Sequence, residues 1–500
     1  MNGKGAQPFK LFNLRVLPLF AACFILGIFC VKFTTWIAAI ILVAAVLFLF
    51  VLWRTKSIER RLALILAVVL AIGYLSAATT LHFRNEVGLS GEQTVTCRVI
   101  DLIAGSDGTY TVKADYLRAD GTLYVGKITF ETEEPVSIGD RLALSGEVSI
   151  KTLSLDTLSS ALLYRKGTKY ALDSAVVLER SAGAPPLRHT IRSKILAVLT
   201  DTEGDRAGAF SYAMLFGDSE FMDPLDKEAM REVGIAHVIA VSGLHVGVLI
   251  AAILFLLRKL RLKDGVSLLI LLPLLGFYAY LADFTPSVLR AAIMGLIALT
   301  ASAIGERYDD VSALSLAAIL ILLFKPLYLF DLSFLLSFLA IFGLHSLSRP
   351  LERALLRRKC KPRLASGLAL SLSTTVALVP VSAIVFGRVA LAGIAMNLVV
   401  VPLASVTLVL TVLFLLPTLV FPSFGATLSV LSYLPDAIAE ASRAVADLKL
   451  TADYDFSTAE VLLYYAILGF VGKYSLAKRR VKLVVAGVGV TVLLLLLFLA

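Results

Sequence analysis

Cysteine and charged residues are both scarce in this sequence. The four cysteines, Cys23, Cys30, Cys97 and Cys360, form no CxxC pair, so the sequence carries no cysteine-based metal signature, and we expect no cofactor. Only Cys97 falls in a polar segment, which predicts no disulfide there. Charged residues make up 17% of the chain, whereas soluble domains contain about 25%. This shortage argues against an ordinary soluble protein.

Long apolar runs take the place of the missing charge. Hydrophobic residues account for 58% of the chain, and the mean hydropathy is +0.86. We predict a polytopic α-helical membrane protein with about 12–13 transmembrane or re-entrant helices, because many long windows are nearly uncharged. The runs lie near 17–33, 36–53, 62–82, 236–257, 266–282, 287–304, 311–324, 331–347, 364–385, 389–421, 457–472 and 483–500.

Basic residues cluster in the loops between these runs, as in "RTKSIERR" and "SRPLERALLRRKCKPR". The positive-inside rule makes these loops and the N-terminus cytoplasmic, and it makes residues 84–235 and the C-terminus external. The same parity requires 389–421 to start and end outside. That run is either a two-pass hairpin or a re-entrant element broken at Asn397 and Pro402. The net charge of +10 therefore reflects topology and does not by itself indicate nucleic-acid binding.

The chain divides into four predicted parts. Residues 1–83 form a three-helix membrane anchor, and residues 84–185 alternate apolar and polar side chains in short strands, which predicts a small extracytoplasmic OB-like β domain. This domain holds 11 basic and 14 acidic residues, so we expect it to bind DNA weakly. Residues 186–235 form amphipathic external helices, and residues 236–500 form the main membrane domain.

Polar residues recur where helices are predicted to enter the membrane from outside. With a helix start at Ala236 and a rise of about 1.5 Å per residue, His245 would lie about 14 Å into the membrane. Convergent helix N-termini attract anions. The candidate residues of this polar cluster are His237, Ser242, Gly243, His245, Thr285, Pro286, Arg290, Asp331, Ser333, Asn397 and Pro402.

Each of these residues also has a purely structural interpretation. His237 suits an interfacial histidine, Ser242 can hydrogen-bond its own helix, and Gly243 can permit close helix packing. Arg290 needs a partner inside an apolar helix. An ion pair with Asp331 or Asp283 explains it about as well as a phosphate contact.

Four sequence blocks resemble the ComEC family of competence proteins. They are "HVIAVSGLHVGVL", "TPSVLRAAIMG", "DLSFLLSFLAIFGL" and "NLVVVPLA", in the family's order. The resemblance implies an inner (plasma) membrane channel that passes single-stranded DNA to the cytoplasm during natural transformation. It also implies an external DNA receptor and a cytoplasmic helicase as partners. The metallo-β-lactamase-like domain of many members has no counterpart here, since no HxHxDH cluster occurs, so no nuclease activity is expected.

Two other functions fit the same residues. Ser242 and His245 are three positions apart and could act as nucleophile and base of an intramembrane hydrolase. A transporter of another polyanion or of a lipid-linked substrate would use the same helix ends.

Overall fold

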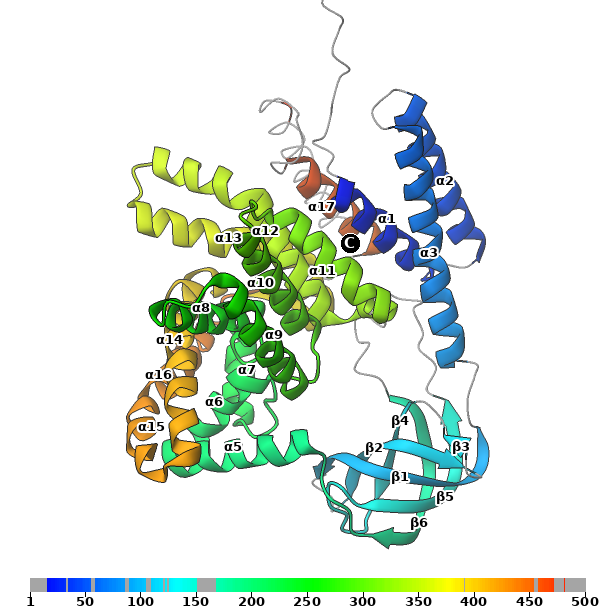
Figure 1. The fold of residues 1–500 in the computed structure, drawn as a ribbon, viewed down its shortest axis with the longest axis vertical. Coiled ribbons are helices and arrows are strands. Elements are labelled where there is room, and N and C mark those ends of the chain that lie inside the picture. The colour runs from blue at the N-terminus through cyan, green and yellow to red at the C-terminus, as the bar shows by residue number, and fades with distance from the viewer. Residues whose placement is uncertain are drawn as a thin grey trace, which may run out of the picture.

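The structure, a computed structural model, joins a large helical body to one small β-barrel (Figure 1). Six helices are long and apolar enough to cross a membrane, and three shorter apolar helices accompany them within the described residues, which confirms the predicted polytopic helical fold. The predicted run 483–500 and the basic N-terminal residues lie outside the described part. The structure describes residues 16–32, 35–54, 59–85, 90–104, 109–119, 122–123, 126–150, 168–390, 392–453, 457–471 and 481.

The described chain opens with three apolar helices, α1 (Val16–Cys30), α2 (Thr35–Arg54) and α3 (Arg60–Asn85). α1 and α3 approach closely because both contribute a glycine to the contact. A Cβ at Gly27 would overlap the backbone of Leu70, and a Cβ at Gly73 would overlap that of Phe24. α1 also packs on α11 (Asp310–Phe324), so the N-terminal helices are attached to the main helical body.

Alternating burial produces a closed barrel after α3. In β4, for example, Ile128, Phe130 and Thr132 are buried while their neighbours face outward. The sheet order is β1-β5-β6-β4-β2-β3, an additional β1–β2 pairing closes the ring, and β4 and β6 run parallel. This topology confirms the predicted OB-like domain. Its strands are β1 (Gly91–Ala104), β2 (Tyr110–Ala119), β3 (Thr122–Leu123), β4 (Lys127–Thr132), β5 (Arg141–Ile150) and β6 (Thr168–Ser181).

The barrel core contains Cys97 as a free thiol. Burial raises the pKa of Cys97 to about 12, with a smaller contribution from Asp115. A thiol in this state is inert at neutral pH, because the reactive species is the thiolate.

Three helices connect the barrel to the membrane helices: α5 (Leu187–Glu203), α6 (Asp205–Phe216) and α7 (Pro224–Glu232). The N-terminus of α7 forms as its sequence indicates. Asp223 accepts a hydrogen bond from the backbone of Leu225 at 2.8 Å, and Pro224 occupies the first helical position. α6 is buried from Ala207 to Phe216.

The membrane helices pack around α10, which contacts α8, α9, α11 and α12. α12 and α13 are held together at Gly343, where a Cβ would overlap Ala377 and the backbone of Ser373. The elements of this region are η1 (Ala236–Val238), α8 (Gly243–Lys259), α9 (Asp264–Leu281), α10 (Pro286–Ile304), η2 (Pro326–Phe330), α12 (Leu332–Arg357), α13 (Pro362–Phe386) and α14 (Gly393–Val420). The last helix that the structure describes is α17 (Thr458–Val471).

The predicted break at Asn397 and Pro402 is wrong. α14 runs without interruption through Gly393–Val420 and contains both residues. Pro402 is exposed, so its ring lies on the outer side of the helix, and the helix loses only one backbone donor there. In apolar surroundings the other backbone groups have no better partner than the helix itself.

The chain from β7 to β8 forms a closed excursion, because the two strands at its ends pair with each other. η3 (Pro422–Phe424), α15 (Gly425–Leu431) and α16 (Tyr433–Ala446) follow α14. They bring β8 (Thr451–Asp453) beside β7 (Arg388–Ala390), where the two short strands pair antiparallel. The two ends therefore lie together, but the return runs through α15 and α16, beyond residue 421, so the alternative of a two-pass hairpin within 389–421 is wrong as well.

Candidate functional site

The predicted helix start at Ala236 is also wrong. Residues 236–238 form only a short 3-10 turn, and α8 begins at Gly243 with Ser242 as its N-cap. The Ser242 hydroxyl accepts a hydrogen bond from the backbone N–H of His245 at 3.3 Å. His245 is thus in the first turn of α8, where its side chain is buried, whereas His237 is exposed in the preceding turn.

A long-range hydrogen bond explains the late start of α8. The carbonyl of Val241 accepts a hydrogen bond from the Ser287 hydroxyl at 2.5 Å, and Ser287 lies in the first turn of α10. This buried bond fixes the non-helical segment before Ser242 to the start of α10. Sequence reasoning missed Ser287, although its place directly after the predicted Pro286 start was a signal.

Arg290 lies at the centre of the cluster, one turn into α10, and is only 5% exposed. Its Nε donates a hydrogen bond to the Ser337 hydroxyl at 2.7 Å, and its guanidinium lies 5.9 Å from the ring centre of Phe338; both partners belong to α12. Nη2 lies directly against Gly243, where a Cβ would overlap it. Arg290 therefore joins α10 to the first residue of α8 and to α12.

The ion pair that the sequence left open for Arg290, with Asp331 or Asp283, does not form. Within the described residues, no carboxylate oxygen lies within ion-pair distance of the Arg290 guanidinium. Asp331 instead caps α12, because its Oδ1 accepts hydrogen bonds from the backbone of Ser333 at 2.9 Å and of Phe334 at 3.2 Å. Asp283 pairs with Arg188 of α5.

The other predicted residues are only partly brought together. Thr285 and Pro286 start α10 as expected, but the Thr285 hydroxyl makes no capping bond and is buried without a described partner. Asn397 also has a buried side-chain oxygen without a described partner, in α14. α14 contacts α8, but within the described residues no hydrogen bond joins Asn397 or Pro402 to the rest of the cluster, so these two residues are peripheral to it.

The electrostatics of this cluster favour an anion. The positive dipole end of α8 begins at Gly243, in contact with the guanidinium of Arg290. The positive end of the α8 dipole and the guanidinium charge repel each other in this buried position, and a bound anion would offset that repulsion. Phosphate groups suit such a place, since backbone N–H groups and a guanidinium both donate to phosphate oxygens.

The geometry expected of a hydrolase is missing among the described residues. A nucleophilic Ser242 would need its hydroxyl within hydrogen-bond reach of a histidine ring nitrogen. The hydroxyl is instead engaged with the backbone N–H of His245, and Nδ1 of that residue is buried without a described partner. Ser242 has the role of a helix cap.

An ionic cluster around the buried Asp226, which sequence reasoning missed, attaches α6 and α7 to α16. The Asp226 carboxylate of α7 accepts hydrogen bonds from Arg206 of α6 at 2.8 and 2.9 Å and from Arg443 of α16 at 2.6 Å. Burial alone would raise the pKa of Asp226, but the two arginines lower it below its ordinary value. The separation of these residues in sequence explains why no local pattern indicated them.

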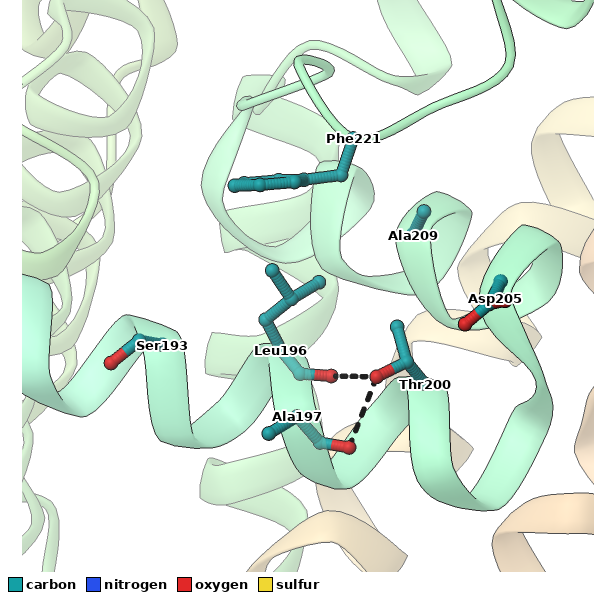
Figure 2. A pocket seen from close by; sticks show the side chains of 7 residues that line it. All are labelled: Ser193, Leu196, Ala197, Thr200, Asp205, Ala209 and Phe221. Carbon is teal, nitrogen blue, oxygen red and sulfur yellow. Dashed lines mark hydrogen bonds between the residues drawn. The ribbon is translucent and has the colours of Figure 1, made fainter. Parts of the chain in front are cut away.

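A second buried carboxylate lies at the end of α5. Glu203 accepts a hydrogen bond from the Ser211 hydroxyl at 2.6 Å, and its other oxygen has no described partner. Burial raises the pKa of Glu203 to about 7, although the bond from Ser211 opposes this shift. A cavity of about 370 Å³ lies nearby between α5 and α6, bordered by Thr200, Asp205 and Phe221 (Figure 2). It is separate from the residues around Arg290.

Comparison with known proteins gives one family match and two relatives. The family model described as "Competence protein" matches residues 214–478. ComE operon protein 3 of Bacillus subtilis (strain 168) is 32% identical over 193 residues, which cover 38% of this chain and 24% of that protein. An uncharacterized protein of Aquifex aeolicus (strain VF5) is 30% identical over 165 residues, 33% of this chain and 38% of its own length. The match thus spans less than two fifths of either relative, and no solved structure matches.

Proposed function

Because this chain belongs to the competence protein family, we propose that it is a membrane channel that conducts single-stranded DNA into the cytoplasm, with Arg290 contacting the DNA backbone. Membership of the family and similarity to ComE operon protein 3 support a role in DNA uptake. The apolar helices make it a multi-pass membrane protein. An external DNA receptor and a cytoplasmic helicase would complete the route.

One observation carries the proposal: the guanidinium of Arg290 is buried against the N-terminus of α8 without a described carboxylate partner. Removing a charge from water costs several kcal/mol, and proteins normally offset this cost with an opposite charge. Ser337 and Phe338 offset part of it. A DNA phosphate would supply the missing negative charge.

Gly243 suits this role because it has no side chain. The absence of a Cβ lets the guanidinium rest on the first residue of α8, so its charge and the helix dipole act at one position. One such contact attracts a phosphate without holding the whole strand tightly. Conduction requires this balance, since each site must release what it binds.

Uptake of labelled DNA tests the proposal in a strain that lacks the native protein and carries a variant copy. Arg290→Ala should abolish uptake while the protein still accumulates in the membrane. Arg258→Ala is the matched control, because this arginine lies exposed at the other end of α8 and should leave uptake unchanged. Wild-type uptake by Arg290→Ala would contradict the proposal. Normal DNA uptake in the strain without the protein would refute the transport function itself.

A further inference from the structure

The loop between α9 and α10 has an unusual backbone. Asp283 and Phe284 have φ values of 57° and 48°, in the left-handed region that bulky residues rarely adopt. Hydrogen bonds from the Phe284 N–H to the Ala279 carbonyl at 2.7 Å, and from the Asp283 N–H to the Tyr280 carbonyl at 3.2 Å, maintain this shape. The result is a phenylalanine ring held 44% exposed at the start of α10.

The Phe284 ring has a fixed aromatic neighbour. The centre of the Tyr280 ring lies 6.4 Å away at an interplanar angle of 65°, an edge-on arrangement. The Tyr280 hydroxyl accepts a hydrogen bond from the backbone N–H of Arg188 at 3.2 Å, and the Arg188 guanidinium pairs with Asp283. These bonds tie the aromatic pair to the first turn of α5.

This aromatic pair lies near the start of α5, the helix that follows the last strand of the barrel. Figure 1 shows the start of α5 beside the end of α9, at the side of the helical body where the barrel is attached. Along the chain, Phe284 precedes Arg290 by two extended residues and one helical turn, at most about 13 Å. A strand with a phosphate at Arg290 would therefore carry a base within reach of Phe284.

We propose that Phe284, supported by Tyr280, stacks on a nucleobase of the strand whose phosphate contacts Arg290. The inference rests on the proposed function and adds a second binding site to it. Aromatic rings bind single strands of any sequence because every base has a π-face. The bonded loop keeps the ring exposed and ready to stack, so little side-chain freedom is lost on binding.

The test measures binding of fluorescent single strands to the full-length protein in lipid nanodiscs, with an ordinary oligonucleotide and an abasic one of equal length. Phe284→Ala should weaken binding of the ordinary strand by about tenfold and leave the abasic strand unchanged. Phe284→Tyr should keep the affinity. Phe284→Leu should lose it, because leucine retains size and apolarity without a π-face.

Phe277→Ala is the matched control, because this phenylalanine of α9 is 47% exposed and lies about two turns before Phe284. If both substitutions weaken both strands equally, Phe284 is an interfacial anchor of the helix and the inference is wrong. It is also wrong if Phe284→Ala changes neither strand. Arg290→Ala keeps the two proposals apart: it should weaken both strands, and failure to do so would refute the phosphate contact whatever Phe284 does.

Discussion

The Arg290 guanidinium lies directly on Gly243, the first residue of α8, so that a Cβ at position 243 would overlap Nη2. Glycine is therefore needed at position 243 because a side chain there would occupy the space of the guanidinium. Gly243→Ala should displace the guanidinium and reduce DNA uptake nearly as much as Arg290→Ala does. Gly247→Ala is the control, because no atom lies within 4 Å of a Cβ there. Equal uptake by both alanine variants would contradict the importance of this contact.

Asp331 should behave as a helix cap. Its Oδ1 accepts two backbone hydrogen bonds at the start of α12, and asparagine caps helices about as well as aspartate. Asp331→Asn should therefore retain uptake and thermal stability, whereas Asp331→Ala should lose about 1 kcal/mol of stability. Thermal unfolding of the purified variants measures the difference. If Asp331→Asn were as damaging as Asp331→Ala, the negative charge of Asp331 would be required, which would contradict a role as helix cap alone.

Glu203 should make the folded protein less stable as the pH rises. Its pKa is about 7 in the folded protein, above its ordinary value of 4.5, so the folded state holds a proton that the unfolded state releases. Stability should fall between about pH 4.5 and 7 and then level off, by about 3 kcal/mol in all.

Glu203→Gln should remove this fall and raise the unfolding temperature at pH 8, because glutamine can still accept the hydrogen bond from Ser211. Glu133→Gln, at an exposed position of the barrel, is the control and should change little. An unfolding temperature with the same pH dependence in wild type and Glu203→Gln would show that Glu203 is ionised in the folded state.

The external position of the barrel is a prediction from charge patterning. In a variant without the four native cysteines, Glu134→Cys in the barrel should react with an impermeant thiol reagent in intact spheroplasts. Lys359→Cys, in the basic loop between α12 and α13, should react only after lysis. The reverse pattern of labelling would invert the topology.

Local patterns predicted the elements of this protein well and their junctions poorly. Alternation of buried and exposed residues indicated the barrel, and Pro224 and Pro286 marked true helix starts. The start of α8 could not be predicted in this way, because it depends on the bond between Val241 and Ser287, 46 residues apart. The Ser242-Gly243 pair carried the only local signal, a cap residue, and the apolar residues before it obscured that signal.

The sequence named candidate residues for the site but could not give the contacts between them. Arg290 and Gly243 do meet, because α8 and α10 start side by side. Of the two roles considered for Arg290, the ion pair is wrong, because two residues at the same depth in the membrane need not face each other. Ser337 was missed because serines in apolar helices usually bond their own backbone.

The salt dependence of DNA binding tests most directly whether Arg290 contacts a phosphate. Binding of a single-stranded oligonucleotide to the full-length protein in nanodiscs would be measured over a range of salt concentrations. Each phosphate contact contributes about 0.7 to the slope of log Kobs against log salt for a single strand. Arg290→Gln should make the slope shallower by about this amount, and Arg258→Gln should not change it. An unchanged slope and affinity in Arg290→Gln would contradict the phosphate contact on which the proposed function depends.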